Sequence, residues 1–224
     1  MQNNKMTIEN IPEYNFSIIE MIKEGFARIE GVKLTFVIAF VIYMAIAIVL
    51  NVILSFFFPS PPPPADPNIL NQQIVGILSY PVLIPLMVGI MMLAIKHSRG
   101  ESIEYKSIFD YYHIIGHLSL AGILIYILTL IGFVLLILPG IYLSIAYVFT
   151  FPLIADKGLD VWEAMELSRK AVTKNWFKVF GLMLLLGLIF GLGALAFGIG
   201  LIWAIPLMFV TLYGLLYPLI FDGV

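Results

Sequence analysis

Three residues near position 113 have the types and spacing that a metal site requires. Asp110, His113 and His117 follow one another at intervals of three and four residues, which places them on one face of a helix. Two imidazoles and a carboxylate so arranged are ligands that zinc accepts. The group stands, however, where a polar segment enters an apolar run, and histidines at such a boundary need no metal. We predict no metal and no cofactor.

The sequence offers few residues for other kinds of catalysis. There are 0 cysteines, which excludes thiolate nucleophiles, disulfides and thiolate metal sites. No Ser/His/Asp set, carboxylate pair within an apolar run or phosphate-cradling glycine loop is visible, so we do not expect an enzyme. The net charge of -2 lacks the basic character of a nucleic-acid-binding protein.

The composition indicates instead a polytopic membrane protein. Hydrophobic residues make up 61% of the chain and charged residues only 12%, and the mean hydropathy is +1.03. Soluble domains contain about 25% charged residues. The 224 residues leave room for six membrane spans, because each span needs about 20 apolar residues.

The apolar runs set the expected spans. Two of them, residues 111–155 and 179–221, lack Asp, Glu, Lys and Arg for 45 and 43 residues. Each run is about twice as long as one bilayer crossing, so each must fold back on itself. We expect the first run to turn at Pro139-Gly140, with Pro139 as the first residue of the returning helix. We expect the second run to turn near residues 197–200. We expect six spans, at residues 34–58, 74–95, 114–136, 139–155, 179–197 and 200–221.

Amphipathic segments precede the three pairs of spans. Ser17 and Glu20 have the spacing of a helix cap before the first pair. We expect surface helices at residues 15–31, 102–112 and 160–175, and a proline-rich outer loop at residues 59–73. The predicted fold is therefore all-α: one membrane domain over residues 1–224, with six transmembrane helices in three hairpins, each preceded by a cytoplasmic amphipathic surface helix.

The positive charges predict the orientation. Cytoplasmic loops of membrane proteins hold an excess of lysine and arginine. The 12 here fall before the first expected span (Lys5, Lys23, Arg28, Lys33), between the second and third (Lys96, Arg99, Lys106) and between the fourth and fifth (Lys157, Arg169, Lys170, Lys174, Lys178). Six crossings with both termini in the cytoplasm place all of them on one side.

Two short patterns suggest an internal repeat and specific contacts. The sequence FPLIAD, ending at Asp156, recurs as YPLIFD, ending at Asp222. We expect these aspartates to cap helices or to pair with basic residues of the surface helices, for example Arg169. Gly187 and Gly191 form a small-residue pair that favours close helix packing, more simply within the monomer than between copies.

The stretch Ile137–Leu186 resembles the YciC-type bacterial inner-membrane proteins and the related membrane domain of some glycerophosphodiester phosphodiesterases. The matching motif positions are Pro139, Gly140, Ile141, Pro152, Asp156, Ser168 and Trp176. The resemblance implies a six-helix protein of the bacterial inner membrane with largely unassigned function. The phosphodiesterase activity is not expected here, because no catalytic domain follows the last span.

The function predicted from sequence is non-enzymatic. The basic surface helices would organise membrane lipid or a protein partner at the cytoplasmic face, since each lysine or arginine near anionic headgroups contributes about 1 kcal/mol. The alternative is a small transporter, a channel or a permease-like subunit. Ion-coupled transporters carry charged groups near the bilayer midplane, and the expected spans hold none except His117 near one end, which counts against a proton- or sodium-driven pump.

The orientation can be tested with single cysteines, because the chain has none of its own. We expect Asp66→Cys and Lys170→Cys to react with a membrane-impermeant maleimide from opposite sides of the membrane. Labelling of intact cells should modify position 66 alone, and position 170 only after lysis. Reaction of both positions from one compartment would contradict an even number of crossings before residue 157.

Overall fold

A computed structural model describes residues 11–59, 69–195 and 198–223. Every regular element in these ranges is helical, which confirms the predicted all-α class. Most of the proline-rich loop, residues 60–68, and part of the expected turn near residue 197 lie outside the described residues. The elements are α1 (Ile18–Arg28), α2 (Lys33–Phe57), α3 (Ile69–Ser98), η1 (Tyr105–Ile114), α4 (Ile115–Leu135), α5 (Ile137–Ala146), α6 (Thr150–Lys157), α7 (Val161–Lys174), α8 (Trp176–Leu195), α9 (Leu201–Phe209), η2 (Val210–Leu216) and α10 (Tyr217–Phe221).

Six helical stretches of the described chain are long and apolar enough to cross a membrane. They are Lys33–Phe57, Asn71–Ser98, Tyr105–Leu135, Ile137–Lys157, Trp176–Leu195 and Leu201–Phe221. This agrees with the expected number of spans and is consistent with an integral membrane protein.

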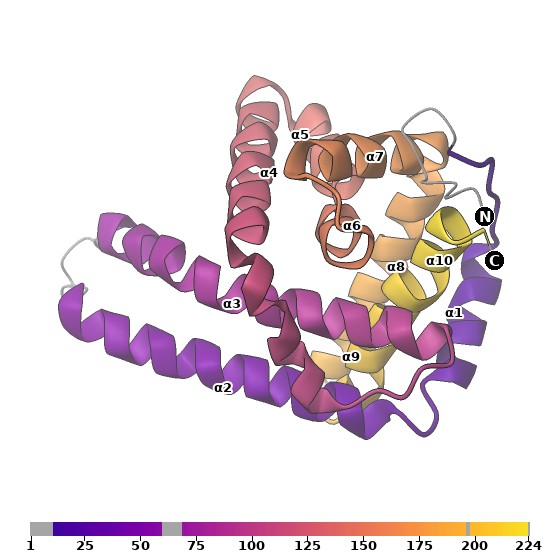
Figure 1. The fold of residues 1–224 in the computed structure, drawn as a ribbon, viewed down its shortest axis with the longest axis horizontal. Coiled ribbons are helices and arrows are strands. Elements are labelled where there is room, and N and C mark those ends of the chain that lie inside the picture. The colour runs from indigo at the N-terminus through magenta and orange to yellow at the C-terminus, as the bar shows by residue number, and fades with distance from the viewer. Residues whose placement is uncertain (1–10, 60–68, 196–197, 224) are drawn as a thin grey trace.

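Neighbouring stretches of the sequence pack together. α2 contacts α3, α4 contacts α5, and α8 contacts α9. Figure 1 shows α2 and α3 extending side by side away from the rest of the molecule, while α4 points in a different direction. The last stretch, α9–η2–α10, is almost entirely buried, and it contacts α1, α2, α3 and α8. These four helices therefore pack around the last stretch.

The three amphipathic segments differ in structure. Ser17 caps α1 as predicted, since its side chain accepts from the backbone N–H of Glu20. The second segment differs from expectation: η1 is a 3₁₀ helix in which Ile108 and Tyr111 are buried, and it packs along α3. Gly89 of α3 permits this approach, because a Cβ there would collide with the backbone of Ile108. Packing against α3 therefore determines the shape of this segment.

The third segment, α7, buries much of its surface against α4, α5 and α6. Asp160 stands at the N-cap position of α7, and its side chain makes no capping hydrogen bond. Seven of its residues are buried, including Ala164, Ser168 and Val172. α7 is thus part of the helical packing rather than an isolated surface element.

Glycines bring some helices together, but not the expected pair. Gly187 and Gly191 have open space around them, so the prediction that they pack within the monomer is wrong. The close approach of α8 and α9 is made by Gly193 and Gly200 instead, where a Cβ on Gly200 would lie 2.5 Å from the Cα of Gly193. These two glycines lie near the end of α8 and just before α9, and the small-residue spacing within α8 does not reveal their contact.

Candidate functional site

Five polar residues form an ionic cluster where three helices end. Arg99 directly follows α3, Asp156 and Lys157 end α6, and Asp222 directly follows α10. The Arg99 guanidinium donates to Asp156 Oδ1 and Oδ2 over 2.6 and 2.8 Å, and to Asp222 Oδ2 from Nε over 3.0 Å. Lys157 Nζ lies 2.6 Å from Asp222 Oδ1, and the Tyr217 hydroxyl donates to Asp156 Oδ2 over 2.9 Å. We refer to these five residues as the Arg99 cluster.

The cluster is balanced in charge and partly buried. The two aspartate side chains are 9% and 15% exposed, and two cations match them. Hydrogen bonds to Asp156 raise the pKa of Arg99 above its ordinary value, although burial opposes this. The planar guanidinium can serve both carboxylates because its donors form a fork. Arg99 therefore stays charged and links two helix ends that are far apart in the sequence.

The prediction that Arg169 pairs with the aspartates is wrong, because Arg99 occupies that position. Arg169 donates instead to Glu166 on its own helix, over 2.8 Å from both Nε and Nη2, and this lowers the pKa of Glu166. Sequence reasoning missed Arg99. A signal was present, however: FPLIAD and YPLIFD end in equivalent aspartates, and Arg99 is a basic residue shortly after the long apolar run that ends at Ile95.

The fourth apolar stretch is interrupted between α5 and α6, and Pro152 and Ser168 explain how this interruption forms and is stabilised. Proline has no N–H to donate at position 152 and clashes with the preceding turn, so α5 ends at Ala146 and α6 begins at Thr150. The break frees backbone groups in a buried place. Ser168 Oγ, from α7, accepts from the Phe149 N–H over 3.1 Å and donates to the Ala146 carbonyl over 2.8 Å. One buried hydroxyl thus satisfies both sides of the break.

The remaining motif positions lie along α5 and α8. Pro139 is the third residue of α5 rather than the first, still within the turn whose N–H groups need no helical partner. Gly140 packs against the ring of Phe133, where a Cβ would collide. Trp176 Nε1 donates to the Tyr142 carbonyl over 3.4 Å, and its ring stacks on Phe180 with centroids 5.3 Å apart. Gly140 therefore allows α5 to approach α4, and Trp176 joins α8 to α5.

The histidines near position 113 do not gather into a metal site. His113 Nδ1 lies 2.6 Å from the backbone oxygen of Asp110, a contact within η1. Within the described ranges there is no group of three His, Cys, Asp or Glu side chains that could hold a metal ion. The spacing that suggested a shared face assumed an α-helix, whereas residues 105–114 form a 3₁₀ helix.

A depression of about 620 Å³ lies where α7 meets α8. Its lining contains two lysines, several aromatic or hydroxyl side chains and no carboxylate: Leu138, Tyr142, Thr173, Lys174, Asn175, Trp176, Phe177 and Lys178. We call it the lysine-aromatic pocket. The Tyr142 hydroxyl and Thr173 Oγ1 lie 2.7 Å apart and join its two sides.

Both lysines are held in place by the segment before α1. Lys174 Nζ donates to the Ile11 carbonyl over 2.8 Å and to Glu13 Oε1 over 2.9 Å, and Lys178 Nζ donates to Asn15 Oδ1. An ammonium group has three donors, so these contacts do not exhaust either lysine. Sequence reasoning selected the lysines but neither Tyr142, which comes from α5, nor Thr173, which directly precedes Lys174 on α7.

No protein-family model, curated protein or solved structure matches this chain.

The role of Ser168 can be tested by removing its hydroxyl. We expect Ser168→Ala to lower the free energy of unfolding by about 1–3 kcal/mol, because two buried backbone groups lose their partner. Thermal unfolding of the purified protein in detergent measures this. Ser144→Ala is the control, since that exposed hydroxyl donates only to the Ile141 carbonyl of its own helix. Equal effects of the two substitutions would contradict the role assigned to Ser168.

Proposed function

We propose that this chain is a non-enzymatic, multi-pass membrane protein that binds anionic phospholipid in the lysine-aromatic pocket. The pocket carries the proposal because it combines two positive side chains with aromatic rings and an apolar residue, and has no carboxylate in its lining. A phospholipid offers a phosphate for the ammonium groups and hydrocarbon for the rings. Each arginine or lysine near anionic headgroups contributes about 1 kcal/mol to the free energy of binding.

The position of the pocket suits a membrane surface. Phe177 is 82% exposed, directly beside Trp176 and between Lys174 and Lys178. Aromatic rings next to lysines are typical of the level where headgroups meet hydrocarbon. Lysine stems lie along apolar surface while their ammonium groups reach the polar layer. The start of α8 therefore has the character of an interfacial anchor.

The arrangement in the membrane is part of the same proposal. The six apolar stretches cross as three hairpins, α2–α3, α4–α5–α6 and α8–α9–η2–α10, with α1, η1 and α7 at the cytoplasmic side and both termini in the cytoplasm. Support comes from the charges: the Arg99 cluster gathers the ends of α3, α6 and α10 in one place. Helices whose ends meet there leave the membrane on the same side.

We also propose a family and a membrane for this chain. The motif positions Pro139, Gly140, Pro152, Asp156, Ser168 and Trp176 support a YciC-type protein of the bacterial inner membrane. A protein partner at the cytoplasmic surface helices would use the same face as the lipid. The alternative, a small transporter or channel, gains no support from the lysine-aromatic pocket, whose lining comes from α5, α7, α8 and the residue between the last two.

Quenching of Trp176 fluorescence tests the proposal. In a Trp162→Phe, Trp203→Phe background Trp176 is the remaining tryptophan, and it lines the pocket. We expect phosphatidylglycerol with brominated chains to quench it more strongly than brominated phosphatidylcholine. Lys174→Gln and Lys178→Gln should each reduce this preference about fivefold, the factor that corresponds to about 1 kcal/mol.

Lys23→Gln is the matched control, because Lys23 is exposed on α1, outside the pocket, and makes no ion pair with another described residue. Its lipid preference should equal that of the parent protein. The proposal fails if the preference for phosphatidylglycerol is unchanged in the Lys174→Gln and Lys178→Gln variants, or if it falls equally in the control.

A further inference from the structure

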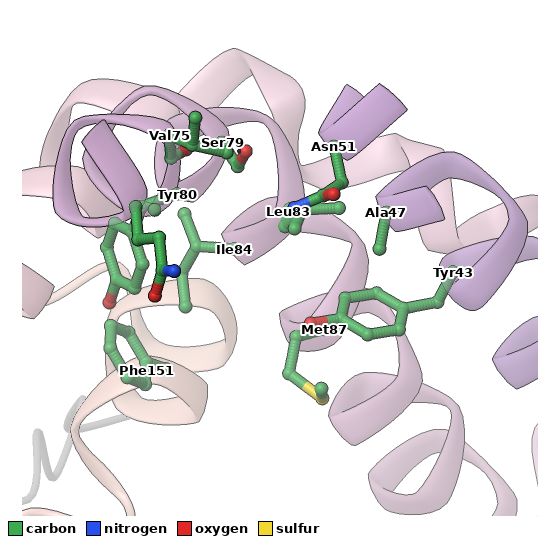
Figure 2. Close-up of a pocket in the computed structure, with 12 residues that line it drawn as sticks. Tyr43, Ala47, Asn51, Val75, Ser79, Tyr80, Leu83, Ile84, Met87 and Phe151 are labelled. Atoms are coloured by element: carbon green, nitrogen blue, oxygen red, sulfur yellow. Dashed lines mark hydrogen bonds between the residues drawn. The ribbon is translucent and has the colours of Figure 1, made fainter. Parts of the chain in front are cut away.

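A second pocket, of about 560 Å³, lies between α2 and α3 and is closed on one side by Phe151 of α6. Figure 2 shows Tyr43, Ala47 and Asn51 of α2 on one side and residues of α3 on the other. Its size falls within the range of small-molecule sites, about 300–1,000 Å³. We call it the α2–α3 pocket, and it shares no lining residue with the lysine-aromatic pocket.

Small residues keep the pocket open. Tyr43, Ala47 and Asn51 follow one another at four-residue intervals and so lie on one face of α2. Ala47 lies at the middle of this face, and Gly76 on α3 has no heavy atom within 4 Å of the position a Cβ would take. Longer side chains at these two positions would fill the space between the helices. The hollow is thus encoded in the sequence.

Polar groups with no protein partner line this hollow. The hydroxyl of Tyr43 and the side-chain amides of Asn51 and Gln72 form no hydrogen bond with any other described residue. All three lie on helices that are long and apolar enough to cross a membrane. A polar group without a partner in hydrocarbon costs several kcal/mol. Three such groups at one pocket indicate a ligand that can form hydrogen bonds.

The lining also restricts the charge and length of the ligand. It contains no Asp, Glu, Lys, Arg or His, so a charged ligand would lack a counter-charge in a medium where that is costly. Tyr43 and Asn51 are eight residues apart on α2, which corresponds to about 12 Å along the helix. Hydrogen-bonding groups spread over that length fit an elongated molecule better than a single water.

We propose that the α2–α3 pocket binds an uncharged glycerolipid of the diacylglycerol class. Its hydroxyl and ester groups form hydrogen bonds with the asparagine, glutamine and tyrosine side chains, and a hydrocarbon chain lies along Leu83, Met87 and Phe151. This site goes beyond the anionic-lipid site of the proposed function. It selects its ligand by hydrogen bonding without charge, whereas the lysine-aromatic pocket selects by charge.

Photo-crosslinking of the full-length protein tests this site. The protein is reconstituted in phosphatidylcholine vesicles that contain a diazirine-labelled diacylglycerol or, separately, a diazirine-labelled phosphatidic acid with the same chains. Crosslinked peptides are identified by mass spectrometry. We expect the diacylglycerol probe to label residues of the α2–α3 pocket at least fivefold more than the phosphatidic acid probe does.

Two variants should reduce this labelling. Gly76→Leu fills the pocket, and Asn51→Leu removes an amide while keeping the side-chain size similar. The control is Gly187→Leu, because Gly187 also has open surroundings on an apolar helix but lies outside both pockets. We expect labelling to fall at least fivefold in the first two variants and to be unchanged in the control.

Three results would overturn the proposal: no labelling in the pocket, equal labelling by the two probes, or undiminished labelling in Gly76→Leu. Fluorescence quenching at Trp176 reports on anionic-lipid binding in the lysine-aromatic pocket. It therefore distinguishes a failure of the diacylglycerol proposal from a failure of the proposed function. Gly76→Leu should leave the phosphatidylglycerol preference intact, and Lys174→Gln with Lys178→Gln should leave diacylglycerol labelling intact.

Discussion

The arrangement of this protein depends on two aspartates that must share cations in a partly buried place. Asp156 and Asp222 lie at the ends of two helices with nearly the same closing sequence, and a negative charge left unpaired in such a partly buried place is costly. Arg99 contacts both, and Lys157 completes the balance. Because these residues sit at the ends of α3, α6 and α10, their pairing fixes where three distant parts of the chain meet. The enclosed position of the last helical stretch follows from this meeting point.

A second constraint shapes the region where lipid is proposed to bind. Pro152 interrupts the fourth apolar stretch, and Ser168 satisfies the backbone groups left free at the interruption. These contacts place α7 along α5. As a result, Thr173 contacts the Tyr142 hydroxyl, and the Trp176 indole donates to the Tyr142 carbonyl. The lysine-aromatic pocket forms at this junction. Residues that resemble a family motif in the sequence therefore act together in the structure as supports for one surface.

The sequence predicted well what depends on composition and length. Long uncharged runs separated by polar segments require apolar helices, and six such helices are present in the described part of the chain. The Ser17 cap was predictable because it involves neighbouring residues only. Contacts between distant residues were not predictable in this way. Arg169 seemed a suitable partner for the aspartates, but its neighbour Glu166 was closer, and Arg99 was positioned by the packing of α3 against η2 and α10.

The double-mutant cycle of Arg99→Gln and Asp222→Asn is the most direct measurement of the central claim. The arginine variant leaves one negative charge in excess and the aspartate variant one positive charge, so each should lower the free energy of unfolding by about 3 kcal/mol or more. The double variant restores balance between Asp156 and Lys157. We predict that it loses at least about 1.5 kcal/mol less than the sum of the two single losses. The exposed pair Arg28 and Glu24 provides the comparison, with a coupling of about 0.5 kcal/mol or less. Additive losses at Arg99 and Asp222 would contradict the claim that this ionic cluster holds the helix ends together.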